Sequence, residues 1–258
     1  MIYETLTYGV DQDIAVITLN RPTVMNALNT QMRAEITDAM RKAGQAARVV
    51  VLTGSGRAFC SGQDLGAEGN FADIDLERTL KDEYVPMLKA ITECPVPTIS
   101  AVNGPAAGAG ANLALAADVV IAAESAYFVQ AFTRIGLIPD AGGTYLLPRQ
   151  MGLAKAMGAA LFADKICARQ ASEMGMIWES VSDEKFDSQW QARAAHLATG
   201  PTETYGHLKT AIRQSLSNSE EHQLELEARL QGACGRTRDF KEGVTAFLDK
   251  RVAKFEGR

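Results

Sequence analysis

The sequence has few residues of the kinds that bind metals or carry redox chemistry. Its 258 residues include three histidines, none of them before residue 196, and four widely spaced cysteines that form no CxxC pair. A cluster of histidine ligands or a Ser/His/Asp triad is hard to build from such a distribution. We therefore expect no metal ion and no redox cofactor, and cysteines that are reduced and mostly structural.

Basic clusters and long apolar runs are also missing. The formal net charge is −5 and no run of lysine or arginine occurs, so the sequence lacks the electrostatic signature of a nucleic-acid binder. No apolar stretch is long enough to span a membrane, and residues 1–5 show neither the basic region nor the apolar core of a signal peptide. These absences predict a cytoplasmic protein that binds neither nucleic acid nor membrane.

The chain does contain an alternation of short strands and helices. Four apolar runs that end in turns are typical of buried strands: 14–19, 48–53, 97–102 and 119–122. Residues 29–46 carry apolar side chains at helical spacing behind a polar N-cap, Asn29 or Thr30. Repeated strand–turn–helix units predict an α/β fold with crossover connections.

The character of the chain changes near residue 195. Residues 220–229 are highly charged and helical in pattern, and residues 240–251 resemble a terminal amphipathic helix. We therefore predict two parts, a core at 1–195 that carries the active site and a helical segment at 196–258 used for self-association. Within the core, the small polar residues 66–73 are expected to form a mobile surface loop near the site, followed by a charged helix from about Asp75.

Two glycine-rich turns follow predicted strands, at the strand ends where α/β folds place ligands. The first spans 56–65 and the second 103–112, where Asn-Gly-Pro-Ala-Ala-Gly-Ala-Gly-Ala-Asn has almost no bulky side chain. Two such loops can direct two backbone N–H donors at one oxygen. The alternative is that the glycines serve loop shape alone. Cys60, in the first turn, is a further candidate as a nucleophile, although no histidine lies near it in sequence.

Asp140 is the carboxylate in the most catalytic-looking setting, within Ile-Pro-Asp-Ala-Gly-Gly-Thr at 138–144. An aspartate in such a turn is also a plausible helix N-cap. One anion-stabilising pair of turns and one carboxylate favour proton transfer over a hydrolysis that needs two catalytic groups.

Four motifs, in order, resemble the crotonase (enoyl-CoA hydratase/isomerase) superfamily. They are Asn-Arg-Pro at 20–22, Phe-Cys-Ser-Gly-Gln-Asp-Leu at 59–65, the turn at 103–110 and Gly-Leu-Ile-Pro-Asp-Ala-Gly-Gly-Thr at 136–144. The likeness extends to residues 241–251 and so covers essentially the whole chain. It implies a crotonase-type spiral of repeated ββα units with a helical C-terminal trimerisation segment, hence a homotrimer or a dimer of trimers.

The resemblance also implies roles for residues of the turns. Gln63 and Ala109 fall where the family supplies the two oxyanion-hole N–H groups. The two catalytic glutamates of hydratases are replaced by Asn112 and Phe132, neither of which can exchange a proton. Asp140 falls where isomerases and dehalogenases of the superfamily carry a catalytic aspartate. Asn112 could hydrogen-bond a substrate or simply fill the turn.

Contacts to the CoA part of the substrate are implied at further positions: Asn26, Ala27, Leu28, Asp64 and Leu65, with Phe247 and Lys250 reaching the CoA of a neighbouring subunit. Simpler roles compete for several of them. Asp64 could hold its loop through backbone hydrogen bonds, Phe247 could be a helix-packing residue, and Lys250 a solvated charge. Arg21 and Lys250 are candidates for binding the CoA phosphates.

The predicted activity is that of an acyl-CoA isomerase that needs no cofactor, since CoA is part of the substrate. The motifs resemble in particular the phenylacetate-pathway branch that converts ring-1,2-epoxyphenylacetyl-CoA to oxepin-CoA. The alternatives are isomerisation of 3-enoyl-CoA to 2-enoyl-CoA, weak hydration through Asp140, and a non-catalytic binding protein, including an RNA binder. Segments 66–90 and 125–135 are expected to shape the acyl pocket. Four aromatic residues suit an aromatic acyl group or a core: Phe71, Tyr84, Phe128 and Phe132.

Overall fold

A six-stranded sheet forms the centre of the molecule. The computed structural model describes residues 3–66 and 75–258, so the predicted loop at 66–73 and Phe71 lie largely or wholly outside the described residues. The strand order is β1-β2-β3-β4-β6-β9, with β1 antiparallel to β2 and the other neighbours parallel. The strands are β1 (Leu6–Asp11), β2 (Ile14–Leu19), β3 (Val49–Gly54), β4 (Thr98–Val102), β6 (Val119–Ala123) and β9 (Glu179–Val181). All four predicted strands are confirmed.

A second, three-stranded sheet lies beside the first. It consists of β5 (Ala106–Ala107), β7 (Tyr127–Val129) and β8 (Ile166–Cys167), with β7 in the middle. Strand β5 lies inside the second glycine-rich turn and leads directly into α4 (Ala109–Leu115). The small sheet therefore fixes the backbone of that turn, which the sequence pattern alone does not reveal.

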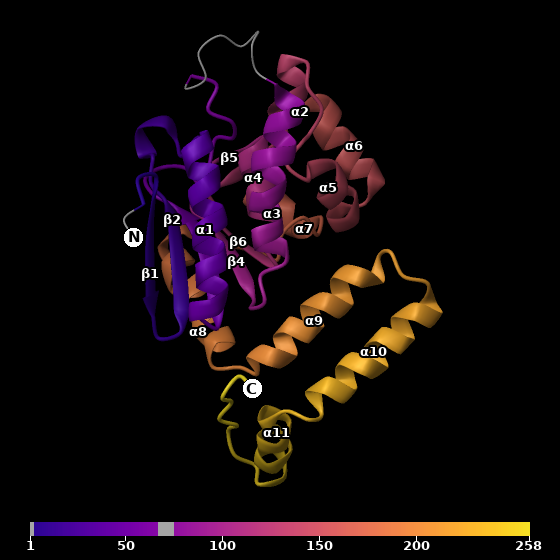
Figure 1. Ribbon diagram of the computed structural model, residues 1–258. Coiled ribbons are helices and arrows are strands. Elements are labelled where there is room, and N and C mark those ends of the chain that lie inside the picture. The colour runs from indigo at the N-terminus through magenta and orange to yellow at the C-terminus, as the bar shows by residue number, and fades with distance from the viewer. Residues whose placement is uncertain (1–2, 67–74) are drawn as a thin grey trace.

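Helices cover both faces of the large sheet. On one face lies α1 (Thr30–Ala46), which buries Met32, Ile36 and Met40 in the main core, as its apolar spacing predicts. Its N-cap is Asn29, whose side chain accepts a hydrogen bond from the Met32 N–H at 2.9 Å. On the other face α8 (Asp183–Ala198) buries Phe186 against β3, β4 and β6. Two hydrophobic layers therefore flank one sheet. Figure 1 shows α1 and α8 on its opposite sides.

The shorter helices connect these layers and surround the ends of the strands. They are η1 (Pro22–Val24), α2 (Leu76–Thr79), η3 (Leu80–Tyr84), α3 (Val85–Thr92), η4 (Ala131–Ile135), α5 (Gly143–Met151), α6 (Leu153–Phe162) and α7 (Ala168–Glu173). Asp75 is the N-cap of α2, which confirms the predicted start of a helix there. Within the described part of the chain, no helix combines the length and the apolar character needed to cross a bilayer.

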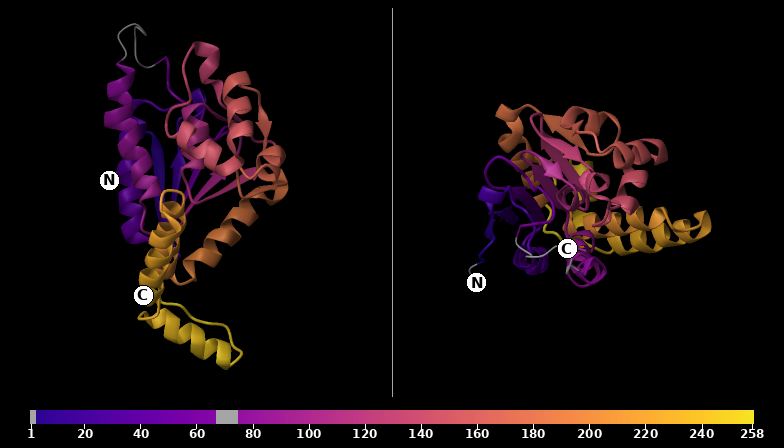
Figure 2. Two further views of the ribbon diagram at one scale, coloured as in Figure 1. Left: turned by 90° about the vertical axis from the view of Figure 1, so that its right-hand side faces the viewer. Right: turned by 90° about the horizontal axis from the view of Figure 1, so that it is seen from above.

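Three C-terminal helices form an arm that projects from this body (Figures 1 and 2). They are α9 (Thr202–Ser215), α10 (Glu220–Cys234) and α11 (Arg238–Leu248). The predicted division at residue 195 falls inside α8, which stays packed on the sheet to Ala198 because its buried side chains continue past that point. Because α8 packs on the sheet, it belongs to the body, and the arm begins with α9.

Polar contacts attach the base of the arm to the body. The carboxylate of Asp118, the residue just before β6, forms ion pairs with Lys209 at 2.6 Å and with Arg213 at 2.7 Å, both on α9. Arg48 donates to the Thr202 hydroxyl at 2.8 Å and to the carbonyl of Phe255 at 3.3 Å. The C-terminal residues therefore return to the point where the arm leaves the body, as Figure 1 shows.

Candidate active site

The two glycine-rich turns lie directly against each other. The Ala107 N–H donates to the Cys60 carbonyl at 2.9 Å, which joins the second turn to the first. Gly62 has a φ of +94°, and a Cβ at that position would lie 2.8 Å from the Ala107 carbonyl oxygen and 3.5 Å from the Ala109 nitrogen. A side chain at Gly62 would force the turns apart, so glycine is required for this close approach.

Gln63 and Ala109, the two predicted oxyanion-hole residues, border the same cavity. Ala109 is the first residue of α4, so its N–H has no carbonyl within the helix to bind. The residue before it, Gly108, adopts a φ of +52° and turns the chain into the helix. The geometry brings together the two positions that the motifs predict, although their role as donors to a substrate oxygen stays a prediction.

The cavity has a volume of about 290 Å³ and mostly apolar walls. This is close to the lower end, about 300 Å³, of typical small-molecule sites, and so suits an acyl group better than a whole acyl-CoA. Its apolar lining includes Leu65, Leu76, Leu80, Phe132, Ile135 and Leu137. Six further side chains supply polar groups to the walls: Ser61, Gln63, Thr79, Tyr84, Arg134 and Asp140.

Asp140 lies in this cavity as a desolvated carboxyl group. Burial raises its pKa from 3.8 to about 6. Among the described residues, no group donates a hydrogen bond to its buried Oδ1. The alternative role as a helix N-cap is wrong, because α5 begins at Gly143 and its N-cap is Gly142. A carboxylate with a pKa near neutrality and a free oxygen in a ligand-sized cavity is suited to take and return a proton.

The two positions that carry glutamates in hydratases offer no acid or base to the cavity. Phe132 lines the wall with its ring. Asn112 is fully buried, and its amide is turned away into the protein: Nδ2 donates to the Asp140 carbonyl at 2.7 Å, and Oδ1 accepts from Gln130 at 2.9 Å. Substrate contact by Asn112 stays a prediction, but both ends of its amide are already engaged.

A buried arginine that the sequence reasoning missed supports the first turn. Arg33 is 1% exposed, and its guanidinium donates to the Gln63 side-chain oxygen at 2.7 Å and pairs with Glu83 at 2.7 Å. Tyr84 also donates to that Gln63 oxygen, and Arg33 lies over the Tyr84 ring at 4.9 Å. The spacing of Arg33 indicates that it is buried, since it lies three positions before Ile36 and seven before Met40 on the buried stripe of α1.

Cys60 is placed where it cannot serve as a nucleophile. The side chain is completely buried and burial raises the pKa of its thiol to about 12, so the thiolate is not formed near neutral pH. Its Sγ donates instead to the Asn26 carbonyl at 3.1 Å.

The predicted CoA-binding residues of the first half divide into two groups. Asn26, Ala27 and Leu28 are buried, and the Asn26 amide donates to the carbonyls of three residues in the neighbouring loop: Ser55, Ala58 and Phe59. The side chains of this segment therefore hold the loops together, and any contact to CoA has to come from backbone atoms. Leu65, by contrast, is partly exposed and lines the cavity.

Asp64 stabilises its own loop. It accepts a hydrogen bond from the Gly66 N–H at 3.1 Å and pairs with Arg21 at 2.7 Å. Arg21, a candidate for the CoA phosphates, is thus engaged with Asp64 in this structure. Phe247 lies on α11, Lys250 follows that helix, and neither lines the cavity. Figure 1 shows α11 at the end of the arm, away from the body. The contact of Phe247 and Lys250 with the CoA of a neighbouring subunit stays a prediction.

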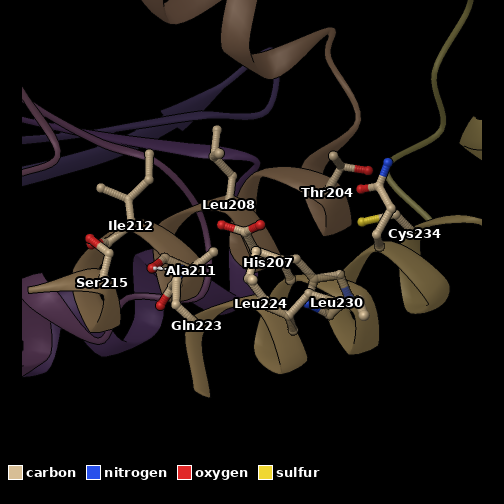
Figure 3. Close-up of a pocket in the computed structure, with 13 residues that line it drawn as sticks. Thr204, His207, Leu208, Ala211, Ile212, Ser215, Gln223, Leu224, Leu230 and Cys234 are labelled. Atoms are coloured by element: carbon tan, nitrogen blue, oxygen red, sulfur yellow. Dashed lines mark hydrogen bonds between the residues drawn. The ribbon is translucent and has the colours of Figure 1, made fainter. Parts of the chain in front are cut away.

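Several larger hollows lie on the described surface, two of them along α9, and neither of these two contains chemistry of this kind. One, of about 630 Å³, is the groove between α9 and α10, which Figure 3 shows lined by Leu208, Ile212 and Leu224. The other, of about 660 Å³, separates α9 from residues 92–96. Neither brings together a pair of glycine-rich turns and a desolvated carboxylate, so the cavity at Asp140 is the candidate active site.

The cavity can accommodate a carbonyl oxygen that gains negative charge. Such charge develops when the neighbouring carbon loses a proton. A thioester carbonyl forms an enolate in that way, and the molecule belongs to the class of crotonase-fold enzymes that act on CoA thioesters. Residues 9–258 match the family described as enoyl-CoA hydratase/isomerase, and the chain belongs to that family.

Individual relatives agree over the full length of the chain. A Rhodobacter capsulatus protein named "Probable enoyl-CoA hydratase" is 60% identical and covers 100% of both chains. The 1,2-epoxyphenylacetyl-CoA isomerase of Escherichia coli is 45% identical over 99% of both. The crystal structure of a "putative Enoyl-CoA hydratase/isomerase" from Mycobacterium abscessus, 36% identical, covers 98% of this chain and 100% of its own with a TM-score of 0.93. The predicted crotonase fold is confirmed.

Proposed function

We propose that this protein isomerises acyl-CoA thioesters, with ring-1,2-epoxyphenylacetyl-CoA as its substrate. The observation that carries the proposal is the lone, desolvated carboxylate of Asp140 in a cavity where the two hydratase glutamate positions hold Asn112 and Phe132. The identity of 45% with the Escherichia coli 1,2-epoxyphenylacetyl-CoA isomerase supports the choice of substrate.

In the epoxide, the carbon–carbon bond between the two epoxide carbons first opens, which converts the fused rings into one seven-membered oxepin ring and needs no proton or leaving group. One proton is then moved within the substrate. Asp140 takes a proton from the carbon next to the thioester carbonyl, and the negative charge passes to the carbonyl oxygen. The N–H groups of Gln63 and Ala109 stabilise that oxygen. The same carboxyl group then returns the proton to a carbon further along the conjugated system, so that product and substrate have equal mass.

Hydration is the less favoured activity on chemical grounds. Addition of water to a double bond needs one group to activate the water and a proton for the carbon. Asp140 could take one of these roles, but Phe132 is apolar and the Asn112 amide is engaged elsewhere. The relative at 60% identity carries a hydratase name, which makes the direct comparison of the two activities necessary.

A second candidate is isomerisation of 3-enoyl-CoA to 2-enoyl-CoA. The aliphatic part of the wall, formed by Leu76, Leu80 and Leu137, suits a hydrocarbon chain. The same proton transfer by Asp140 would serve both reactions, so the acyl group alone distinguishes them. A purely binding role, including RNA binding, accounts less well for a desolvated carboxylate in the cavity and for a net charge of −5.

We propose further that the protein assembles as a homotrimer or as a dimer of trimers through its helical arm. Large apolar side chains on the arm are exposed in the single chain, among them Ile212, Leu224 and Phe247. Their burial between subunits would stabilise the assembly and would bring Phe247 and Lys250 toward the CoA of a neighbour.

The activity is tested by incubating the protein with 3-hexenoyl-CoA, 2-hexenoyl-CoA and enzymatically generated epoxyphenylacetyl-CoA, followed by mass and absorbance analysis of the products. We expect an isomer of unchanged mass from the epoxide. Isomerisation of 3-hexenoyl-CoA alone would favour the second candidate. Rapid gain of one water by 2-hexenoyl-CoA would refute the isomerase assignment.

A further inference from the structure

We infer that Asn112 is a positioning residue for Asp140: its amide holds the backbone of the base in place, and Gln130 sets the direction of that amide. The inference rests on the proposed function for its catalytic meaning. Position 112 holds a catalytic glutamate in hydratases, and asparagine cannot exchange a proton there. The inference gives the Asn112 amide a role of its own at that position.

The hydrogen-bonded chain runs from β7 through α4 to the turn that carries Asp140. Gln130, just after β7, donates from Nε2 to the Asn112 Oδ1 at 2.9 Å. Because this oxygen is engaged, the Nδ2 of Asn112 points the other way and donates to the Asp140 carbonyl at 2.7 Å. Both amides are buried, Asn112 completely and Gln130 to 1% exposure. In a buried site such bonds determine orientation strongly.

The Asn112 amide packs closely against the turn that carries Asp140. A Cβ on Gly143 would lie 2.4 Å from the Asn112 Nδ2, so the glycine is what allows the amide to reach the turn. The Asp140 carbonyl also accepts from the Gly143 N–H at 2.8 Å. Both lone pairs of that carbonyl are therefore engaged, and the peptide plane after Asp140 is fixed from two sides.

The turn needs this support because its backbone is unfavourable. Ala141 has a φ of +46°, a left-handed conformation that is costly for a residue with a Cβ, and Gly142 follows with a φ of +81°. A strained turn persists where surrounding contacts hold it. Without the Asn112 bond, the turn can relax and move the Asp140 carboxyl group out of its desolvated position.

Charged and titratable groups around the carboxyl do not provide an equivalent restraint. Tyr84 of η3 and Arg134 of η4 line the same cavity as Asp140. The phenol of Tyr84 donates to Gln63, and the Arg134 guanidinium donates to the Ala163 carbonyl. The carboxyl group is thus held through its backbone, which is the part that Asn112 contacts.

The test combines turnover with a direct titration of Asp140. In Asn112→Leu, which has similar size but no amide, we expect kcat to fall by about 10²-fold with KM nearly unchanged, as for a small misplacement of a catalytic group. By carbon-13 NMR of labelled aspartate carboxyls, with Asp140→Asn to identify the signal, the Asp140 midpoint should fall from about 6 toward 3.8. Gln130→Met should shift the midpoint less, in the same direction.

Gln150→Met is the matched control. Gln150, on α5, donates from a partly buried amide to the Leu115 carbonyl at the other end of α4, at 3.2 Å. Its loss should weaken the fold without moving the Asp140 midpoint. A folded Asn112→Leu or Gln130→Met protein whose Asp140 midpoint equals that of the wild type would overturn the inference. Because the titration needs no substrate, this result is distinct from a failure of the proposed isomerase activity.

Discussion

At the scale of single residues, Asp140 shows a conflict between stability and function. Its carboxylate is partly buried, and this burial outweighs the backbone hydrogen bond that favours the charged form, so the pKa is raised. Replacement by asparagine keeps the shape and removes the charge. We expect Asp140→Asn to abolish isomerisation, to leave affinity for a CoA ligand nearly intact, and to raise stability at pH 8. A gain of even about 1 kcal/mol would raise the Tm by about 2–4 °C.

Calorimetry of both proteins across pH checks the origin of that gain. The folded pKa of about 6 lies above the unfolded value of 3.8, so the native state holds the proton more tightly. The stability of the wild type relative to Asp140→Asn should therefore decline as the pH rises from about 4 to 6. Above about pH 6 the difference in stability between the two proteins should reach its full size and stay constant. A variant with full activity, or with equal stability at every pH, would contradict the role assigned to Asp140.

The same pKa sets the pH dependence of the reaction. The base form of Asp140 is needed to take the first proton, so kcat/KM should fall as the pH decreases through about 6. Burial raises the pKa of Tyr84 above its usual value, so this phenol keeps its proton throughout the range and adds no alkaline limb. Initial rates measured between pH 4.5 and 8 test this directly. An acid limb near pH 4 would place the catalytic carboxyl in water instead.

At the scale of secondary-structure elements, the start of α4 permits removal of one predicted donor with little disturbance. Ala109 is the first helical residue, a position that accepts proline because its N–H has no helical partner. Ala109→Pro should therefore fold, keep its affinity for an unreactive acyl-CoA, and lose turnover by about 10²–10³-fold. Steady-state kinetics and calorimetric titration check the two expectations. Undiminished turnover would exclude the Ala109 N–H from the oxyanion hole.

Elements with a regular hydrophobic period were predictable from the sequence, whereas contacts across elements were not. Local sequence is enough to predict the buried strands β2, β3, β4 and β6 and the apolar stripe of α1. The two-residue strand β5 has no period, and its pairing with β7 depends on the fold. For the same reason the motifs located Asp140, but gave no indication that Asn26 points inward or that Gln130 contacts Asn112.

At the scale of the whole molecule, the arm exposes several large apolar side chains to solvent. Phe247 is 81% exposed and Leu248 72%, both on α11, while Ile212 and Leu224 are 61% and 58% exposed beside the α9–α10 groove (Figure 3). Exposed apolar groups of this density mark interaction surfaces. The proposed assembly would cover them, and it links the oligomeric state to the use of CoA.

If assembly supplies a contact to CoA, loss of assembly should change the KM for an acyl-CoA more than the KM for a substrate that lacks most of the CoA group. In Ile212→Lys/Leu224→Lys the buried lysines would oppose association, so we expect smaller species in analytical ultracentrifugation. If Phe247 and Lys250 of a neighbour contact CoA, the KM for an acyl-CoA should rise, while the KM for the same acyl group on pantetheine should stay near its wild-type value. Glu225→Lys, on the exposed side of α10, is the control for added charge. Dissociation that raises both KM values equally would show that the arm supports the fold of the cavity and contributes no CoA contact.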